Sequence, residues 1–478
     1  MSRSVSEQSV DRRDRFGDLF PLPLRAFEEL FVHDDNGPLY PTVFSTRFLF
    51  EGEFDDDLAA KALNDVMNRQ PMLSVRLNRK DDRRLEWVSA CDGDAGGRIF
   101  SIKWLDRLQS IDLENEPPIR LHVNHHPTAA NIDKTELTFQ FHHAVVDGVG
   151  AFAVINDWMR AYDRLSSSEK SRSSKTKPRT QLNFDMLRNR CRSGLTRSER
   201  LRLARWYWLS LIGFWNFFRN TPIPLVPKAR IGAVSIETSS EDQPAPIISA
   251  TIDQEATESL KARAAELEAT MNDLMAVELL AAVKQWQTDQ SLCAEGSHIR
   301  ISIPINERGM RHRKMPACNH CTMISLDRRP DRIPIDPRSD SFRKFVQNVH
   351  HEIDTVREWR LSLTFWNSLS LFRRLGGLKK WFATEEIRST CVLTNLGQLG
   401  QRLRLPTNEQ GQVLVAGNRL TQVEAVAPIR YGTAAAFAVY IYCRQLTIAM
   451  NYDQASLTRD QAESLLHQFA DRLGTALI

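Results

Sequence analysis

Two adjacent histidines followed by an Asp-Gly pair are the residues whose types and spacing best suit chemistry. They stand in residues 139–150, which read Phe-Gln-Phe-His-His-Ala-Val-Val-Asp-Gly-Val-Gly. Because successive side chains of an extended chain point to opposite sides, only one of His142 and His143 can face a given cleft. An imidazole, with an ordinary pKa of about 6.5, can take a proton from a hydroxyl or an amine near neutral pH. Gly148 and Gly150 allow a tight turn and a close approach of substrate to the backbone.

The histidine pair also has a structural interpretation. Paired histidines at the end of a strand are more often satisfied core or turn residues than catalytic ones, and the pair alone favours that interpretation. Asp147 comes four residues after the second histidine, beyond the predicted turn. A junction of this kind, where a strand ends and a helix begins, often carries a functional site.

Hydrophobic periodicity predicts strands and helices in both halves of the chain. Strands are expected at 40–51, 119–123, 137–142, 247–252, 298–303 and 433–441, and helices at 55–69, 149–165, 254–268, 272–287, 342–356 and 459–473. Interspersed elements of both kinds favour an α/β or α+β fold. The histidine pair then lies at the end of one strand, and Asp147 precedes a helix.

Two breaks in composition divide the chain. A Ser-rich stretch at 166–179 has no large apolar residue, and a Pro- and Ser-rich stretch follows at 238–246. Such segments cannot bury much apolar surface. We therefore expect a flexible N-terminus at 1–20, a first subdomain at 21–165, a linker with a basic, aromatic segment at 166–245, and a second subdomain at 246–478.

Composition excludes several classes of protein. The 478 residues are 42% hydrophobic and 26% charged, with a net charge of +4. These values argue against a disordered chain, a membrane-spanning bundle and a dedicated nucleic-acid binder. The seven scattered cysteines do not resemble a disulfide framework. With no apolar signal segment at the N-terminus, the sequence predicts a cytoplasmic protein.

The pattern His-His-x-x-x-Asp-Gly resembles the motif of the condensation-domain and chloramphenicol-acetyltransferase-like superfamily. That superfamily includes wax ester synthase/diacylglycerol acyltransferases, polyketide-associated acyltransferases and alcohol acetyltransferases. Further segments are similar to its landmarks, and they lie at 21–31, 50–55, 69–77, 271–282, 304–308 with Asn319, and 394–397. The likeness thus covers most of the chain.

The resemblance implies a fold and a set of site residues. The fold is a pair of similar subdomains, each a mixed sheet flanked by helices, with a channel between them. His143 would be the general base, while His142, Asp147 and Gly148 complete the motif. Asp147 would turn away and bind an arginine, for which Arg308 is the candidate. The oxyanion donor is either Asn395 or a backbone N–H near Gly148.

The resemblance also implies the substrates. A CoA or carrier-protein thioester would be the acyl donor, with no tightly bound cofactor and no metal, and donor and acceptor would enter from opposite faces. The plant Asp-Phe-Gly-Trp-Gly and the wax-synthase Asn-Val-Pro-Gly-Pro segments are absent, so the subfamily stays open. We predict transfer to a hydroxyl acceptor. The alternatives are a free-standing condensation enzyme, which would form an amide on substrates bound to a separate carrier protein, and a non-catalytic binding scaffold of the same fold.

Two aromatic, basic segments, 188–218 and 359–382, suggest apolar substrates. One interpretation is that they form helices which pack on the core or line an acyl-chain tunnel. The other is that they contact a membrane surface. No nucleic-acid-binding signature accompanies their arginines. A third cluster, His312, Cys318, His320 and Cys321, has only one Cys-x-x-Cys half of a zinc site, so no metal is predicted.

Overall fold

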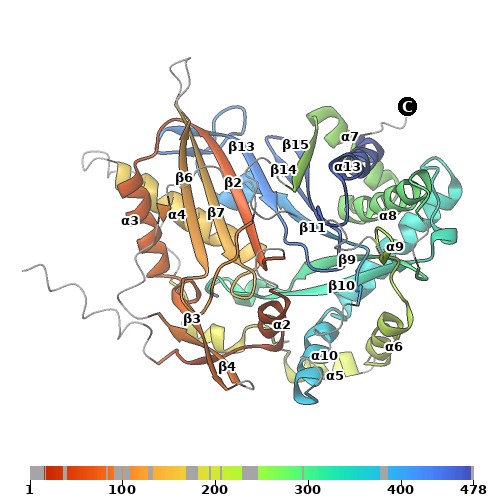
Figure 1. The fold of residues 1–478 in the computed structure, drawn as a ribbon, viewed down its shortest axis with the longest axis horizontal. Coiled ribbons are helices and arrows are strands. Elements are labelled where there is room, and N and C mark those ends of the chain that lie inside the picture. The colour runs from red at the N-terminus through yellow and green to blue at the C-terminus, as the bar shows by residue number, and fades with distance from the viewer. Residues whose placement is uncertain are drawn as a thin grey trace, which may run out of the picture.

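The computed structural model describes most of the chain. The described residues are 16, 18–35, 40–81, 84–90, 99–100, 108–126, 133–167, 181–192, 195–204, 207–228, 246–292, 295–376 and 386–474. Two six-stranded sheets and one three-stranded sheet organise them, with helices on the sheet faces. In Figure 1 most of residues 40–166, in red to orange-yellow, lie on one side, and most of the second half of the chain, in green to blue, lies on the other.

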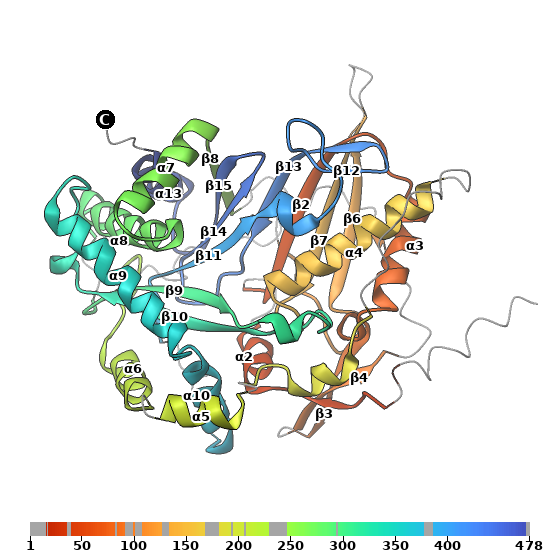
Figure 2. The same ribbon diagram turned by 180° about the vertical axis from the view of Figure 1, so that it is seen from behind.

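The first large sheet carries the histidine motif. Its strands are β2 (Val43–Glu51), β5 (Ile99–Phe100), β6 (Ile119–His126), β7 (Lys134–His142), β12 (Leu414–Val415) and β13 (Asn418–Val426). Their order in the sheet is β12-β13-β2-β7-β6-β5. Helices α3 (Asp56–Met67) and α4 (Gly148–Ser166) cover one face, as Figure 2 shows. Asp55 and Asp147 cap these helices by accepting hydrogen bonds from backbone N–H groups in the first turn.

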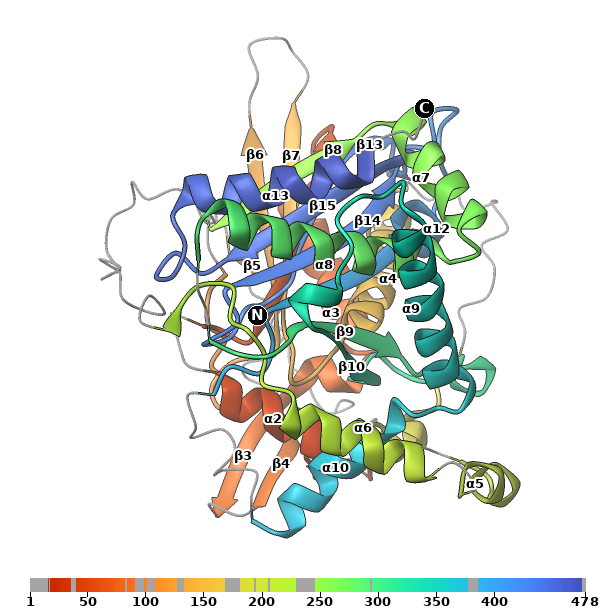
Figure 3. The same ribbon diagram turned by 90° about the vertical axis from the view of Figure 1, so that its right-hand side faces the viewer.

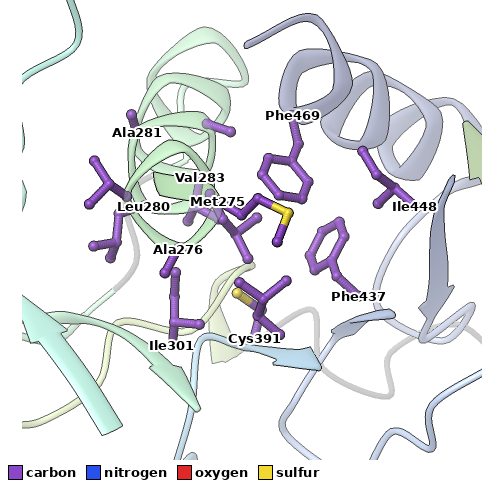
Figure 4. Close-up of a cluster of buried hydrophobic side chains, with 14 of the residues drawn as sticks. Met275, Ala276, Leu280, Ala281, Val283, Ile301, Cys391, Phe437, Ile448 and Phe469 are labelled. Carbon is purple, nitrogen blue, oxygen red and sulfur yellow. The ribbon is translucent and has the colours of Figure 1, made fainter. Parts of the chain in front are cut away.

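The second large sheet holds the other core. Its strands are β8 (Ile247–Ile252), β9 (Ile299–Asn306), β10 (Cys321–Arg328), β11 (Cys391–Gln398), β14 (Ala435–Tyr442) and β15 (Gln445–Tyr452), in the order β10-β9-β11-β14-β15-β8. Helices α7 (Gln254–Glu266), α8 (Met271–Asp289), α9 (Asp340–Glu358) and α13 (Arg459–Gly474) flank it. In Figure 4, Met275 of α8 and Phe469 of α13 point toward Phe437 and Cys391 on the strands, so this core is a helix-on-sheet layer.

Shorter elements close one end of the molecule. The small sheet joins β1 (Leu22–Pro23), β3 (Val75–Asp81) and β4 (Arg84–Ser89). Near it are α2 (Ala26–Asp34), α5 (Arg197–Ala204), α6 (Tyr207–Arg219) and α10 (Leu363–Arg374). Figure 3 shows α6 and α10 side by side below the second sheet. No helix among the described residues is long and apolar enough to cross a membrane.

One segment of the second half belongs to the first sheet. Strand β13 pairs with β2, with Val423 opposite Phe48, and α12 (Leu399–Leu403) packs against α4. An unpaired β2 edge would leave a row of backbone N–H and C=O groups without partners, and the crossing segment satisfies them. The predicted division into subdomains 21–165 and 246–478 did not foresee that a strand of the second would join the sheet of the first.

The predicted elements agree well with the structure. All six expected strands and all six expected helices are present, with ends that differ by a few residues. The expected mixed α/β architecture is confirmed. Strands that the expectations did not include are β5, β12 and β13 in the first large sheet and β10, β11 and β15 in the second. Segments 1–15, 168–180 and 229–245 lie outside the described residues, so the expected N-terminal and linker properties are not described there.

Candidate active site

His143 lies in the turn between β7 and α4, and hydrogen bonds hold its backbone from both halves of the chain. Its N–H donates to the carbonyl oxygen of Thr42 at 2.8 Å. Its carbonyl oxygen accepts from Nδ2 of Asn319 at 2.5 Å. The position of the histidine therefore depends on one residue from the first half of the chain and one from the second half.

The His143 ring lies between two phenylalanines. It stacks on Phe31 of α2 with ring centroids 4.3 Å apart and planes 12° apart, and Phe44 of β2 contacts it edge-on at 5.0 Å. The Nδ1 atom is buried and has no hydrogen bond to another described residue. His143 also lines the large cavity described below. Nε2 is thus the ring nitrogen available to a substrate.

Burial keeps this imidazole in its basic form. Loss of solvation lowers the pKa of His143 to about 4, and the weaker opposing effects of its own backbone carbonyl and of Asp147 do not offset it. At neutral pH the ring is therefore uncharged and can accept a proton. Phe31 was not identified from the sequence, because an apolar residue in a helix has no spacing signal toward a distant histidine.

His142 points away from the cavity and is fully buried. Its Nδ1 accepts from the N–H of Ala144 at 3.1 Å, so Nε2 carries the proton and donates to Oδ2 of Asp35 at 3.0 Å. The other oxygen of Asp35 accepts from the N–H of Thr42 at 3.2 Å. His142 thus ties the end of β7 to the segment after α2. Asp35 is a site residue that sequence reasoning missed, since no motif links it to the histidine pair.

Asp147 joins the two halves of the chain. Its Oδ1 accepts from the N–H of Gly150 at 2.8 Å, and its Oδ2 accepts from Nη1 of Arg308 and from the N–H of His320, both at 2.7 Å. Arg308 also donates from Nη2 to the carbonyl oxygen of Cys318 at 2.7 Å. Burial raises the pKa of Asp147, but the charge and the hydrogen bond of Arg308, together with the N–H groups of Gly150 and His320, outweigh this and lower the pKa below its usual value. The carboxylate is fully engaged and has no hydrogen bond to His143.

Gly150 is required by close packing. A Cβ at this position would lie 2.5 Å from Cγ2 of Val146 and 3.1 Å from the carbonyl oxygen of Cys318. The start of α4 therefore approaches the Cys318 backbone more closely than a side chain permits. Gly148 lines the cavity, and a Cβ there would meet Leu396 at 3.4 Å.

A cavity of about 720 Å³ opens next to His143. Residues from both large sheets line it, including Ser45 and Thr46 of β2 and Met323 and Ser325 of β10. Its wall is rich in aromatic and aliphatic side chains: Phe27, Leu30, Phe31, Phe44, Phe152, Leu209, Phe214, Phe217, Phe218, Ile324, Phe365, Leu369 and Phe372. The site is a largely apolar chamber with one neutral imidazole on its wall.

The structure does not bring Asn395 to His143. Thr394 and Leu396 line the cavity, whereas Asn395 is not among the lining residues. Its Nδ2 donates to Asn272 at 3.3 Å, and its Oδ1 accepts from the N–H of Gly397 at 2.7 Å. Because both polar atoms already have partners, this geometry gives no support to the expected oxyanion role.

The Cys and His cluster holds β10 in place. Nδ1 of His320 accepts a hydrogen bond from the N–H of Cys191 at 3.3 Å. Its ring packs against the rings of His312 and Trp366, with centroids 4.7 and 5.1 Å away. The described residues contain no group of three or more His, Cys, Asp or Glu side chains that could hold a metal ion. Cys318 instead contributes backbone atoms to the Asp147–Arg308 contact.

The two aromatic, basic segments form parts of the cavity wall. Helices α6 and α10 line the chamber with one face each, as the tunnel interpretation expected. One arginine of the first segment, Arg190, is not at the surface: its side chain is buried and binds both carboxylate oxygens of Glu28 at 2.5 and 2.8 Å. Residues 193–194, 205–206 and 377–382 of these segments lie outside the described residues.

Comparisons with known proteins place this geometry in context. A family model described as the condensation domain matches residues 42–308. A variant of the starter condensation domain of rhizomide synthetase, solved in complex with C8-CoA and Leu-SNAC, is 12% identical, with a TM-score of 0.62 over 98% of this chain and 97% of that one. Polyketide synthase associated protein 5 from Mycobacterium tuberculosis is 15% identical, with a TM-score of 0.56 over 95% and 97%.

A third similar structure is the trichothecene 15-O-acetyltransferase from Fusarium sporotrichioides. It is 11% identical, with a TM-score of 0.61 over 94% of each chain. At these identities the solved structures show a shared fold. A search of curated proteins found no match.

Proposed function

Because this chain belongs to the condensation-domain family of acyltransferases, we propose that it transfers an acyl group from a CoA or carrier-protein thioester to a hydroxyl group. The observation that carries the proposal is the neutral imidazole of His143, which lines a large apolar cavity between the two halves of the chain. A partly buried base beside a chamber of this size suits proton transfer from a bound acceptor.

The reaction needs one base and no acyl-enzyme. Nε2 of His143 takes the proton from the acceptor hydroxyl while the hydroxyl oxygen attacks the thioester carbon. The tetrahedral intermediate then collapses, the C–S bond breaks, and the imidazolium returns the proton to the thiolate. The products are an ester and a free thiol. The stacked Phe31 and the edge-on Phe44 keep the ring in the orientation that this transfer requires.

The oxyanion of the intermediate needs a donor. Gly148 is the first residue of α4 and lines the cavity, and the first N–H groups of a helix have no intrahelical acceptor. We assign the role to the Gly148 N–H, which the positive end of the helix dipole strengthens. The Asn395 alternative is less well supported, since its amide already binds Asn272.

Asp147 and Arg308 hold the turn that carries His143 and do not take part in the reaction. Their ion pair spans the two halves, and Asp147 also caps α4 at Gly150. The helix whose first N–H is assigned to the oxyanion is therefore positioned by residues from both halves of the chain. His142 has the corresponding positioning role at the end of β7.

The cavity wall favours a long acyl chain or a lipid-type acceptor. Its aromatic and aliphatic side chains would remove the apolar surface of such a substrate from water, at about 25 cal/mol per Å². The similar rhizomide domain was solved with C8-CoA, an acyl-CoA. We propose acyl-CoA or an acyl carrier as the donor, with no resident cofactor.

Amide formation is the second candidate. The family match to condensation domains favours it, and the similar rhizomide domain was solved with Leu-SNAC. His143 would then take the proton from an amine. The two candidates share the base and the cavity and differ only in the acceptor.

The test is thiol release from a panel of acyl-CoAs, short to long, with ethanol, hexadecanol, diacylglycerol and amino-acid thioesters as separate acceptors. His143→Gln retains the size of the side chain and removes the base, while His467→Ala, on the exposed face of α13, is the matched control. Turnover with an alcohol that is lost only in His143→Gln supports the proposal. Turnover only with amines would replace it by amide formation, and equal activity of His143→Gln would refute the general-base role.

A further inference from the structure

Helix α6 has an outer apolar stripe. Trp208, Leu211, Ile212 and Trp215 follow the spacing of one helical face, and they are 52%, 54%, 46% and 67% exposed. Of the ten large apolar side chains exposed among the described residues, eight lie on α5, α6 and α10 or directly after α10. The exposed apolar surface is therefore concentrated on this end of the molecule, and scattered surface residues do not explain it.

The opposite face of α6 lines the cavity. Leu209, Gly213, Phe214 and Phe217 contribute to its wall. Phe214 also contacts Phe372 of α10 with ring centroids 6.0 Å apart. Helix α6 thus has the cavity on one side and the exterior on the other, next to α10 (Figure 3). An apolar molecule held at the outer stripe would be one helix diameter from the reaction chamber.

The charge on α6 and α10 has one sign, while α5 carries one acidic residue, Glu199. Neither α6 nor α10 contains an Asp or Glu. Arg219 at the end of α6, Arg374 at the end of α10 and Arg197 at the start of α5 are exposed. A surface with apolar and aromatic side chains at its centre and arginines at its ends is complementary to an anionic, apolar partner.

We propose that the outer stripe of α6 docks on an anionic lipid bilayer. At 13 residues the helix is about 20 Å long, too short to span the roughly 30 Å hydrocarbon core, so it would lie in the plane of the interface. Trp208 and Trp215 would occupy the headgroup boundary, where an amphipathic ring is favoured, and the arginines would contact lipid phosphates.

A second copy of the chain fits this surface less well. In a symmetric dimer the same patch meets itself, which would bring the arginines of one copy toward those of the other. Like charges that face each other across an interface oppose association. An anionic bilayer satisfies both the apolar stripe and the positive rim.

The docking has a consequence for the reaction, and this part rests on the proposed acyltransferase function. An acyl chain drawn from the bilayer would pass beside α6 and α10 into the cavity without crossing water. Membrane docking would then raise turnover of bilayer-held substrates and leave turnover of soluble, short-chain thioesters unchanged.

The experiment measures sedimentation of the full chain with vesicles of phosphatidylcholine alone and of phosphatidylcholine with phosphatidylglycerol. We expect binding to the anionic vesicles that salt weakens and that Trp215→Glu reduces by about tenfold or more. Trp215 is not among the residues that line the cavity. The matched control is Leu165→Glu, which changes an exposed leucine at the end of α4, far from the stripe in sequence. It should bind as the wild type does.

Three results would overturn the proposal. These are no binding of the wild type to anionic vesicles, equal binding by Trp215→Glu, and light scattering that shows a wild-type dimer which Trp215→Glu dissociates without a change in vesicle binding. The charge variant Arg219→Glu with Arg374→Glu should remove the preference for phosphatidylglycerol. Thiol release with a soluble donor, measured on the same variants, separates a failure of docking from a failure of the proposed function.

Discussion

The corner that carries His143 and the wall formed by α6 and α10 face the same cavity but are built differently. At the corner the polar side chains next to His143 have defined partners: His142 binds Asp35, and Asp147 binds Arg308 and two backbone N–H groups. On the wall the contacts are mainly between aromatic rings. Directional bonds thus fix the geometry of the corner, whereas the wall offers non-directional apolar surface.

Removing the base should have the largest effect. His143→Ala is expected to lower kcat by about 10²–10⁴-fold, which is the usual contribution of a positioned general base. The free energy of unfolding should change little by comparison, since the ring is held by stacking and not by an ion pair. Stopped-flow or steady-state thiol release measures the rate, and thermal unfolding provides the control. A fully active His143→Ala would show that the corner does not carry the chemistry.

Breaking the ion pair at the corner should have the next largest effect. Arg308→Met leaves Asp147 buried without its counter-charge and should lower the free energy of unfolding by about 3–5 kcal/mol. The matched control is Arg164→Met, whose pair with Asp65 at 3.2 Å has side chains 43% and 40% exposed. It should cost no more than about 1 kcal/mol. Urea unfolding measures both, and equal costs would remove the distinction between the buried and the exposed pair.

The pH dependence of kcat/KM sharpens the assignment of the base. Because burial lowers the pKa of His143 to about 4, the folded enzyme keeps the ring neutral down to mildly acidic pH. At pH 5 a base with that pKa is about thirtyfold more available than one at the ordinary value of about 6.5. The acid limb of kcat/KM should therefore fall near pH 4. A limb near 6.5 would mean that the ring is solvated when it reacts.

The same shift affects stability with a defined sign. Between pH 4 and 6.5 the unfolded histidine binds a proton and the folded one does not, so the folded state loses stability as pH falls through this window. His143→Phe cannot bind a proton in either state. Its stability should therefore depend less on pH across the window than that of the wild type.

A change in the wall should have the smallest and most selective effect. Phe214→Ala removes a ring that lines the cavity and contacts Phe372. We expect kcat/KM to fall by about tenfold for long acyl chains and to change little for acetyl donors, because only a long chain reaches this wall. A panel of acyl-CoAs of increasing length measures the difference. An equal loss of kcat/KM for acyl chains of all lengths would mean that Phe214 supports the site around His143 and does not contact the acyl chain.

Much of the fold was readable from local patterns. The six expected helices and six expected strands are present because apolar periodicity and N-cap residues such as Asp147 act over a few neighbouring residues. The resemblance to the condensation and chloramphenicol-acetyltransferase-like superfamily is confirmed by the family match over 42–308. The exchange of β13 into the first sheet was not predicted, since the pairing of β13 with β2 joins residues far apart in the chain.

The site also has residues that a local pattern identified and residues that only the fold brings together. His142, His143, Asp147 and Gly148 share one short motif, and they are found at one corner. Asp35 and Phe31, which set the orientation of the two histidines, have no fixed spacing from that motif. Asn395 lies in a landmark segment, yet its side chain binds Asn272 and is not among the residues that line the cavity. A landmark in sequence locates a strand, but the pleat decides which of its side chains face the cavity.

Local sequence patterns predicted six helices, six strands, the family and the residues of the histidine motif, because these depend on periodicity, capping and a contiguous motif. Only the tertiary structure decided which histidine faces the cavity, how burial lowers its pKa, and that Arg190 is buried against Glu28 while α6 exposes its tryptophans. The physical reason is that solvation and contact depend on what packs around a side chain. In this protein the packing partners come from segments more than a hundred residues apart.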